Sequence, residues 1–237
     1  MKAMILAAGL GTRFKPWTDK HPKALALVNG KTLLQRNIAY LQQWNIKEVV
    51  VNVHHFAEQI EDAIAASGGW GSRIQVSDER AVVLETGGGV LQAAPLLQDD
   101  VFVTLNVDIL TDLNLEEMLQ AHQAQAALIT LAVTERTTSR YLLFNEAGRL
   151  CGWRNVHTGE EKLPVPSGHL FQKAYSGIAI FDPAVFKYIQ HRGKFSLIDV
   201  YLSLAAAHKI MSFDHSGGRL VDVGRPESVA VAERLFK

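Results

Sequence analysis

Residues 2–25 read KAMILAAGLGTRFKPWTDKHPKAL, an apolar segment that leads into a glycine-bearing loop with basic side chains. The segment Lys2–Ala7 is predicted to be a short strand, and the loop at 8–13 follows it directly. Gly9 and Gly11 can adopt backbone angles that other residues avoid, so the loop can turn sharply and direct successive N–H groups at one anion. The stretch therefore predicts a phosphate-binding turn at the end of a first strand.

The side chains beside this turn have chemistry that suits phosphate. Thr12 offers a hydroxyl donor, and Arg13 offers a planar guanidinium that matches phosphate oxygens better than an ammonium group does. Lys23, directly after Pro22, adds a second positive charge. A glycine-rich turn after a first strand can also do no more than close a strand–helix unit, and the turn alone does not exclude that structural role.

Two common phosphate motifs are excluded by the residues present. The loop lacks Gly-Lys-Ser/Thr, and Phe14 stands where G-x-G-x-x-G would have its third glycine, which also argues against a nucleotide-binding dehydrogenase. What remains, LAAGLGTRFKPWTDKHPKAL at 6–25, closely resembles the signature of the sugar-1-phosphate nucleotidylyltransferases, L-A-A-G-x-G-T-R followed by P-K-x-L. The resemblance implies an enzyme that joins a nucleoside triphosphate to a sugar 1-phosphate and releases pyrophosphate.

Length and composition restrict the class of protein and its partners. A chain of 237 residues with 48% hydrophobic content is enough for one large α/β domain with a sizeable core. Twenty-four basic and twenty-four acidic residues cancel, so no overall field favours nucleic acid or an anionic membrane. No stretch approaches the roughly 18 apolar residues of a membrane span. The single cysteine, Cys151, cannot form an internal disulfide and suits a reducing cytoplasm.

Strand-like and helix-like segments alternate over the first 135 residues. After Lys2–Ala7, the patterns predict strands at Lys47–Val53, Arg73–Ser77, Val101–Asn106 and Ala127–Val133, and helices near 33–41, 56–66, from the glycine cluster through Leu97, and at 115–125. This alternation indicates a doubly wound, mainly parallel, Rossmann-like α/β sheet, which binds ligands at the carboxyl ends of its strands. The phosphate turn, a second glycine cluster at 85–89 and Asp108 all follow such ends.

The pattern becomes richer in strands after residue 135. Strands are predicted at Tyr141–Phe144, Leu150–Val156, Ala174–Phe181, Ile210–Phe213 and Arg219–Val223, with helices near 184–190, 197–208 and 226–236. We expect a single nucleotidyltransferase domain over 1–237, in which 1–135 form the nucleotide-binding core. A small β-rich sugar-binding annex and closing elements make up 136–237.

Two aspartates are candidate metal ligands. Asp108 follows the strand that ends at Asn106, and Asp222 lies in LVDVGRP at 220–226. The family that the chain resembles has an N-G-D segment and a later W-x-D-V-G-T-P segment, each with a metal-binding aspartate. The resemblance thus implies that Asp108 and Asp222 bind Mg²⁺, a hard cation held by one or two carboxylates plus phosphate oxygens. Val107 and Arg225 depart from the family pattern, and each aspartate can instead serve a turn.

The implied reaction needs no general base, because the phosphate of a sugar 1-phosphate is already an anion near neutral pH. Arg13, Lys23 and Asp108 are the expected catalytic residues. Arg13 is expected to hold the leaving β- and γ-phosphates, and Lys23 to bridge the attacking phosphate and the α-phosphate. The other nucleotide-binding residues expected near the phosphate turn and the strand ends are Ala8, Gly9, Gly11, Thr12 and Asn106.

The glycine cluster ETGGG at 85–89 resembles the base-binding loop of the family. Gly87, Gly88 and Gly89 are therefore expected to lie at the nucleobase, with tight helix–strand packing as the alternative. Together with VNVHH at 51–55, this form is most similar to the bacterial subgroup that contains the N-acetylmuramate-1-phosphate uridylyltransferases. The resemblance favours UTP, and mannose- and heptose-1-phosphate guanylyltransferases are near relatives.

The sugar-binding residues are predicted from two segments of the annex. Gly177 lies in YSGI at 175–178, which resembles a family segment where a glycine approaches the sugar ring. Asn155 is the choice after the strand at Leu150, although Glu160, Glu161 and Lys162 supply the family's Glu-Glu-Lys several residues later. The sequence does not decide which of these two sets faces the sugar.

Two other classes of function are compatible with part of this pattern. A non-catalytic module that senses nucleotide sugars is expected to lose Arg13, Lys23 or a metal aspartate, and all are present. Transfer to a phosphoalcohol, as in a phosphocholine cytidylyltransferase, requires the same phosphate turn with a different acceptor pocket. The expected partners are a nucleoside triphosphate and a sugar 1-phosphate, without nucleic acid or membrane, for a monomer or homodimer.

Overall fold

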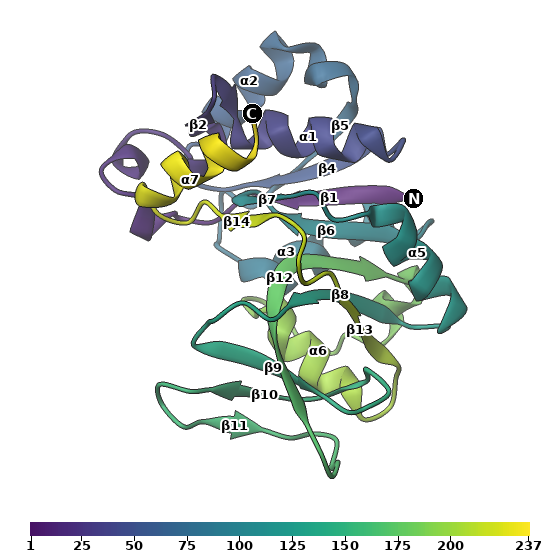
Figure 1. The fold of residues 1–237 in the computed structure, drawn as a ribbon. Helices are drawn as coiled ribbons and strands as arrows, with labels where there is room; N and C mark the ends of the chain where they lie inside the picture. Colours follow the sequence, from purple (N-terminus) through teal and green to yellow (C-terminus); the bar gives the residue numbers. More distant parts are fainter.

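Four strands pair in parallel, as the alternation of strands and helices predicts. In the computed structural model, which describes residues 1–237, β1 (Lys2–Leu6) lies between β4 (Glu48–Val53) and β6 (Phe102–Asn106). The strand β5 (Arg73–Asp78) follows β4 at the edge (Figure 1). Ile5 aligns with Val51 on one side and Leu105 on the other. The carboxyl ends of these strands therefore meet at one edge of the sheet.

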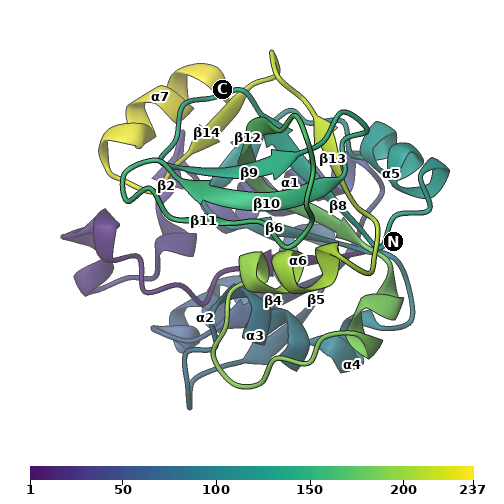
Figure 2. The ribbon, with the colours of Figure 1, turned by 90° about the horizontal axis from the view of Figure 1, so that it is seen from below.

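Side chains on β1 alternate between two hydrophobic cores, because successive residues of a strand point to opposite faces. Ala3 and Ile5 belong to the core under α1 (Leu33–Gln43), α2 (Ala57–Ala66), α5 (Leu115–Ala124) and α7 (Glu227–Leu235). Met4 belongs to the core under α3 (Glu85–Gln92), α4 (Ala94–Leu97) and α6 (Leu197–Ala205), which Figure 2 shows on the other side of the sheet from α5 and α7. Helices thus cover both faces, as a doubly wound sheet requires.

One long strand, β12 (Phe171–Phe181), joins the parallel part of the sheet to the β-rich annex. Its second half pairs antiparallel with β6 and with β8 (Ile129–Thr134), which in turn pairs with β13 (Ile210–Asp214). Its first half pairs with β9 (Arg140–Phe144), followed by β10 (Leu150–Asn155) and β11 (Glu161–Lys162). The annex therefore continues the same ten-stranded sheet.

A separate two-stranded ribbon lies beside the main sheet. β7 (Ile109–Thr111) follows β6 after a turn, and it pairs antiparallel with β14 (Leu220–Asp222) from near the end of the chain. The sequence pattern predicts β14 but not β7, because three residues directly after a buried strand are too few to show a period of their own. A second short ribbon joins β2 (Leu27–Val28) and β3 (Lys31–Thr32).

Several predicted elements differ from the structure. The glycines at 87–89 were expected in a loop but lie inside α3, and the helix breaks near Pro95 into α3 and α4. The helix predicted at 184–190 is a 3₁₀ helix at Pro183–Lys187, and other 3₁₀ turns occupy Thr12–Phe14, Trp17–Asp19, Lys23–Leu25 and Gly68–Gly71. None of the helices has both the length and the apolar character needed to cross a membrane.

A buried histidine makes stability depend on pH. His122 of α5 is 3% exposed, its Nδ1 lies 2.9 Å from Oγ1 of Thr130, and burial lowers its pKa. The unfolded chain therefore binds a proton at His122 more readily than the folded chain does. The contribution of neutral His122 to folding stability is complete above about pH 6.5 and is lost as the pH falls. We expect His122→Gln to reduce the fall in urea midpoint between pH 7.5 and pH 5.5. His157→Gln, at an exposed position, is the control. An equal fall in urea midpoint in the wild type and in both variants would contradict the prediction.

Candidate active site

A cavity of about 520 Å³ lies at the carboxyl ends of β1, β4 and β6. It brings together residues predicted from the first loop and from the strand after it: Ala8, Gly9, Gly11, Thr12, Lys23, Asn106 and Asp108. Its other walls include Glu85 and Thr86, from the stretch at 85–89 that resembles the base-binding loop, and four side chains that were not predicted, namely Asn52, Glu79, Lys194 and Ser196. The phosphate turn and the first aspartate therefore share one cavity.

Gly11 and Gly9 serve this turn in different ways. Gly11 has a φ of 60°, and a Cβ on it would lie 2.8 Å from Cγ2 of Thr18, so neither the backbone nor the space permits a larger residue. Thr18 donates from Oγ1 to the Gly11 carbonyl at 2.9 Å and closes the turn. Beside Gly9 no atom lies within 4 Å of the Cβ position. The backbone at Gly9 is therefore open to a ligand.

Asn52 fixes the start of the turn. Its Oδ1 accepts hydrogen bonds from the amides of Ala7 (2.7 Å) and Ala8 (3.3 Å), and its Nδ2 donates to Oε1 of Glu79 at 2.7 Å. A signal for this role exists in the sequence, since Asn52 is the one polar residue in the apolar run VVVNV at 49–53. A buried amide in such a strand requires partners of its own, and here the partners are the loop backbone and a carboxylate.

Glu79 presents a buried carboxyl group to the same cavity. The residue is 2% exposed, burial raises its pKa, and its Oε2 has no hydrogen-bond partner. A Cβ on Gly89 would lie 2.5 Å from its Oε1, so Gly89 leaves the space that this carboxyl group occupies. An unpaired buried oxygen in a cavity wall is a feature that a bound ligand can satisfy.

Gly87 and Gly88 are buried in α3 and pack against the segment before α6. Both amides donate to the carbonyl of Phe195, and side chains at these positions would collide with Phe195 and with the Gly193 carbonyl. The structure accounts for these glycines by close packing, and none of Gly87, Gly88 and Gly89 is among the residues that line the cavity. Their contact with a nucleobase stays a prediction.

The two aspartates are brought together by the β7·β14 ribbon. Asp222 pairs in register with Ile109, the residue after Asp108, and the Val223 amide donates to the Asp108 carbonyl at 2.8 Å. The Asp108 carboxylate also forms an ion pair with the Lys23 ammonium, and both side chains are largely buried. Val107 is not among the residues with positive φ, so the loss of the family glycine causes no backbone strain there.

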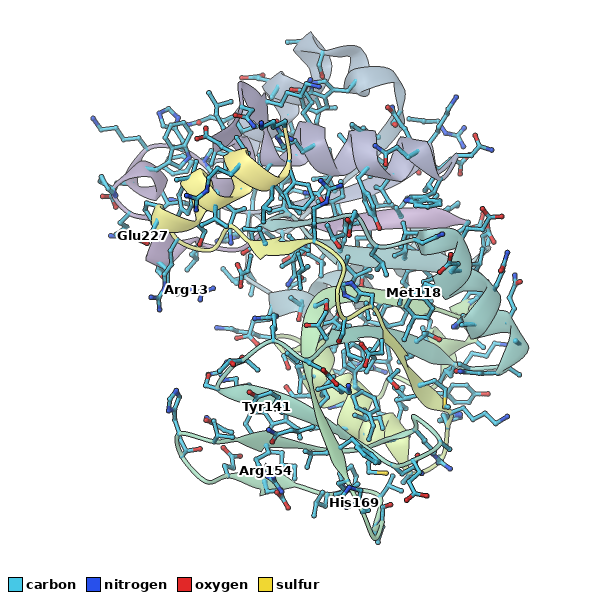
Figure 3. All side chains as sticks on the ribbon, viewed as in Figure 1. Arg13, Met118, Tyr141, Arg154, His169 and Glu227 are labelled. Atoms are coloured by element: carbon cyan, nitrogen blue, oxygen red, sulfur yellow. The ribbon has the colours of Figure 1, made fainter.

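Asp222 and Arg13 are not among the residues that line the cavity. The Asp222 side chain is exposed, and its pKa is raised, first because surrounding protein displaces part of its hydration and second by the charge of Asp108. Lys23 and Arg13 oppose this shift. A Cβ on Gly224 would lie 3.2 Å from an Nη of Arg13, so Gly224 makes room for the guanidinium. Figure 3 shows Arg13 projecting toward the side where Tyr141 and Arg154 mark the annex.

The donor set at these aspartates fits Mg²⁺. Two carboxylates, Asp108 and Asp222, are the right number for a cation that takes its remaining ligands from phosphate oxygens and water. No group of three or more His, Cys, Asp or Glu side chains that could hold a metal ion by themselves occurs in the structure. The raised pKa of Asp222 beside Asp108 is consistent with a place where a cation would relieve repulsion between carboxylates.

The predicted sugar residues lie outside the cavity. Gly177, with a φ of 77°, sits in the register shift of β12, and a Cβ on it would lie 2.8 Å from Nδ2 of Asn106. Asn155 ends β10 and accepts from the His157 amide through its Oδ1 at 3.0 Å. Glu160, Glu161 and Lys162 pair among themselves and with Arg154 on β10. Neither annex set lines the cavity, and sugar contacts by Gly177 and Asn155 stay predictions.

A family model described as nucleotidyl transferase matches residues 2–236 of the chain. The chain belongs to this family. Among curated relatives it is 32% identical over 240 residues to an N-acetylmuramate alpha-1-phosphate uridylyltransferase of Caulobacter vibrioides, covering 98% of this chain and 95% of that protein. It is 44% identical to a protein of the same name from Neisseria meningitidis, over 120 residues that cover 51% of this chain and about half (52%) of that relative.

Solved structures share the fold of this nucleotidyl transferase. The crystal structure of HddC from Yersinia pseudotuberculosis superposes with a TM-score of 0.80 at 22% identity and covers 100% of this chain and 99% of that one. A UDP-glucose pyrophosphorylase complexed with UDP-glucose gives a TM-score of 0.76 at 17% identity, with coverage of 99% and 97%. Both likenesses show that the chain has the same overall fold as these structures.

Removing the Asn52 amide should weaken both the fold and the site. Asn52→Ala leaves the Ala7 and Ala8 amides without their acceptor, for which we expect a loss of about 1–3 kcal/mol in the free energy of unfolding. The loop also loses its fixed position, so the KM for the nucleotide should rise. Gln42→Ala, which removes polar contacts to Trp70 and Ser72 far from the loop, is the control. An unchanged nucleotide KM in Asn52→Ala would count against this role of Asn52.

Proposed function

We propose that the protein transfers a nucleoside monophosphate, with UTP as the favoured donor, to a sugar 1-phosphate and releases pyrophosphate in a Mg²⁺-dependent reaction. The proposed acceptor is N-acetylmuramate 1-phosphate or a related hexose or hexosamine 1-phosphate. The observation that carries the proposal is the single cavity that is lined both by the open backbone at Gly9 and by the Lys23–Asp108 pair. The names of two curated relatives support the choice of base and sugar.

Different residues have different roles in the proposed in-line displacement. An oxygen of the sugar phosphate forms a bond to the α-phosphorus, and the bond from that phosphorus to the oxygen of the β-phosphate breaks. In this proposal the turn at 8–12 offers backbone amides to the phosphates, and Arg13, next along the chain, holds pyrophosphate as it leaves. Lys23 lies beside Asp108 and bridges the two reacting phosphates. Mg²⁺, held by Asp108 and Asp222, would neutralise charge on the phosphates.

The buried Glu79 supports a base with an N–H donor. As a carboxylate it can only accept hydrogen bonds; Glu79 lines the cavity, and its buried Oε2 has no hydrogen-bond partner. Uracil N3 and guanine N1 both carry a hydrogen, whereas cytosine N3 is an acceptor and would meet the carboxylate unfavourably. This favours UTP, keeps a guanylyltransferase as the second candidate, and disfavours a phosphocholine-type cytidylyltransferase. Mannose-1-phosphate guanylyltransferase of Danio rerio is a relative at 29% identity.

The reaction can be tested by measuring pyrophosphate release over a matrix of nucleotides and acceptors. We expect the highest turnover with UTP and N-acetylmuramate 1-phosphate or a related hexosamine 1-phosphate, among UTP, GTP, CTP and dTTP with several sugar 1-phosphates. Phosphocholine serves as the non-sugar acceptor. Absence of turnover with every sugar 1-phosphate would contradict the proposal and favour a sensor or a phosphoalcohol transferase.

The two groups of the buried ion pair should be essential to turnover. We expect Lys23→Ala and Asp108→Ala to lower kcat by roughly 100-fold or more, because they remove charges that act on the reacting phosphates. Asp108→Asn, which keeps the shape of the side chain, separates loss of charge from loss of folding. Circular dichroism melting checks that each variant is folded. Turnover near that of the wild type in a folded Lys23 or Asp108 variant would overturn the assignment.

Glu79 should influence the choice of base. In Glu79→Gln the side chain can donate as well as accept, so we expect the ratio of kcat/KM for UTP over CTP to fall by about tenfold. The neighbouring surface variant Arg80→Gln should leave this ratio unchanged. A ratio unaltered in Glu79→Gln would show that the carboxyl group does not contact the base.

A further inference from the structure

A second cavity, of about 620 Å³, lies behind the β7·β14 ribbon. Its walls come from β7 and the residue after it, from α1, and from the end of α7; Figure 1 shows α1 and α7 on the same side of β7. Five cationic side chains line it, namely Lys31, Arg36, Arg219, Arg234 and Lys237, against one acidic side chain, that of Asp112. Because the whole chain has a net charge of zero, this local excess of positive charge is a property of the cavity.

Most of these cations have no anionic partner. Lys31 and Arg234 form no side-chain hydrogen bond or ion pair, and both are exposed to solvent. Arg36 donates only through Nε, to the Val28 carbonyl at 2.8 Å, and burial lowers its pKa although the charge of Glu233 partly offsets this. Arg219 pairs with Asp112 at 2.8 Å. The side chains of Lys31, Arg36 and Arg234 are therefore free to bind an anion.

The cavity also offers aromatic surface. The Arg219 guanidinium lies over the ring of Phe236, with its Cζ 5.4 Å from the ring centroid. Tyr40 also lines the cavity, and its hydroxyl donates to the Leu113 carbonyl at 2.7 Å. Flat apolar surface next to free guanidinium groups suits a ligand that combines charged phosphate with a ring. A simple monovalent anion would use only part of this surface.

The cavity walls support the backbone of both aspartates. Asn37 lines the cavity and donates through Nδ2 to the Val107 carbonyl at 2.9 Å, directly before Asp108. Asp112 follows β7, and Arg219 precedes β14, which carries Asp222. The Arg219–Asp112 pair therefore ties the two strands together at the end of the ribbon opposite the aspartates. A ligand that draws Arg219 away from Asp112 would act on the ribbon that positions Asp108 and Asp222.

We propose that this cavity is an effector site for a diphosphate-bearing small molecule, separate from the candidate active site. Arg36, Arg219 and Arg234, with Lys31, bind the phosphate groups. Binding alters turnover through the β7·β14 ribbon and the Asn37–Val107 contact. This inference goes beyond the proposed function, and the cavity could be occupied whichever nucleotide the active site uses.

The test is a titration with inorganic pyrophosphate, followed residue by residue through amide NMR shifts. In the wild type we expect saturable shifts at Leu110–Asp112 and near Arg234, resolved from those of the loop at 8–12. The double variant Lys31→Gln/Arg234→Gln should weaken binding at the cavity amides by roughly tenfold or more and leave the loop amides unchanged. Lys47→Gln/Lys187→Gln removes two exposed charges elsewhere and is the control.

Three outcomes would overturn the effector site: no saturable shift at the cavity amides, equal binding in the Lys31/Arg234 variant, or equal loss in the control. Absence of shifts only at the loop amides would instead count against the proposed function. A parallel titration with UDP distinguishes the ligand source. Tighter binding of UDP than of pyrophosphate at the cavity amides indicates a nucleotide, and equal binding indicates that the diphosphate alone is held.

Discussion

The antiparallel pairing of β14 with β7 is the contact on which the candidate active site depends. Asp108 and Asp222 are 114 positions apart in the chain, and only this ribbon places Asp222 opposite the residue after Asp108. The hydrogen bond from the Val223 amide to the Asp108 carbonyl extends the ribbon to the aspartates themselves. The parallel sheet supplies one carboxylate, and the returning C-terminal segment supplies the other.

The proposed function explains the buried ion pair between Lys23 and Asp108 better than a role in stability does. Both side chains are largely buried, and two charges removed from water recover their desolvation cost only through close mutual contact. The pair therefore adds little net stability, but it fixes an ammonium group at the mouth of the phosphate turn. Its geometry suits a site where anionic phosphates compete for the same lysine and where Mg²⁺ competes for the same carboxylate.

A second constraint runs through β12, which is shared by the two parts of the sheet. Its second half pairs with β6 and carries Gly177 toward Asn106, whereas its first half pairs with β9 in the annex. The register shift between Tyr175 and Ala179 separates these halves. The annex and the parallel part of the sheet are therefore joined through one continuous strand, which lies beside the strand that ends at Asn106.

The sequence by itself determined the parallel strands and the glycine-bearing turn after the first of them, because periodicity and local motifs act over a few neighbouring residues. The resemblance to the family added the prediction that Lys23, Asp108 and Asp222 act as one set. Only the tertiary structure decided how that set is completed. Asn52 and Glu79 reach the cavity through contacts between different strands, and the glycines at 87–89 pack against Phe195, Gly193 and Glu79, which lie close to them only in the fold. Side-chain direction and long-range pairing arise from packing across the whole sheet, and no local pattern of residues records them.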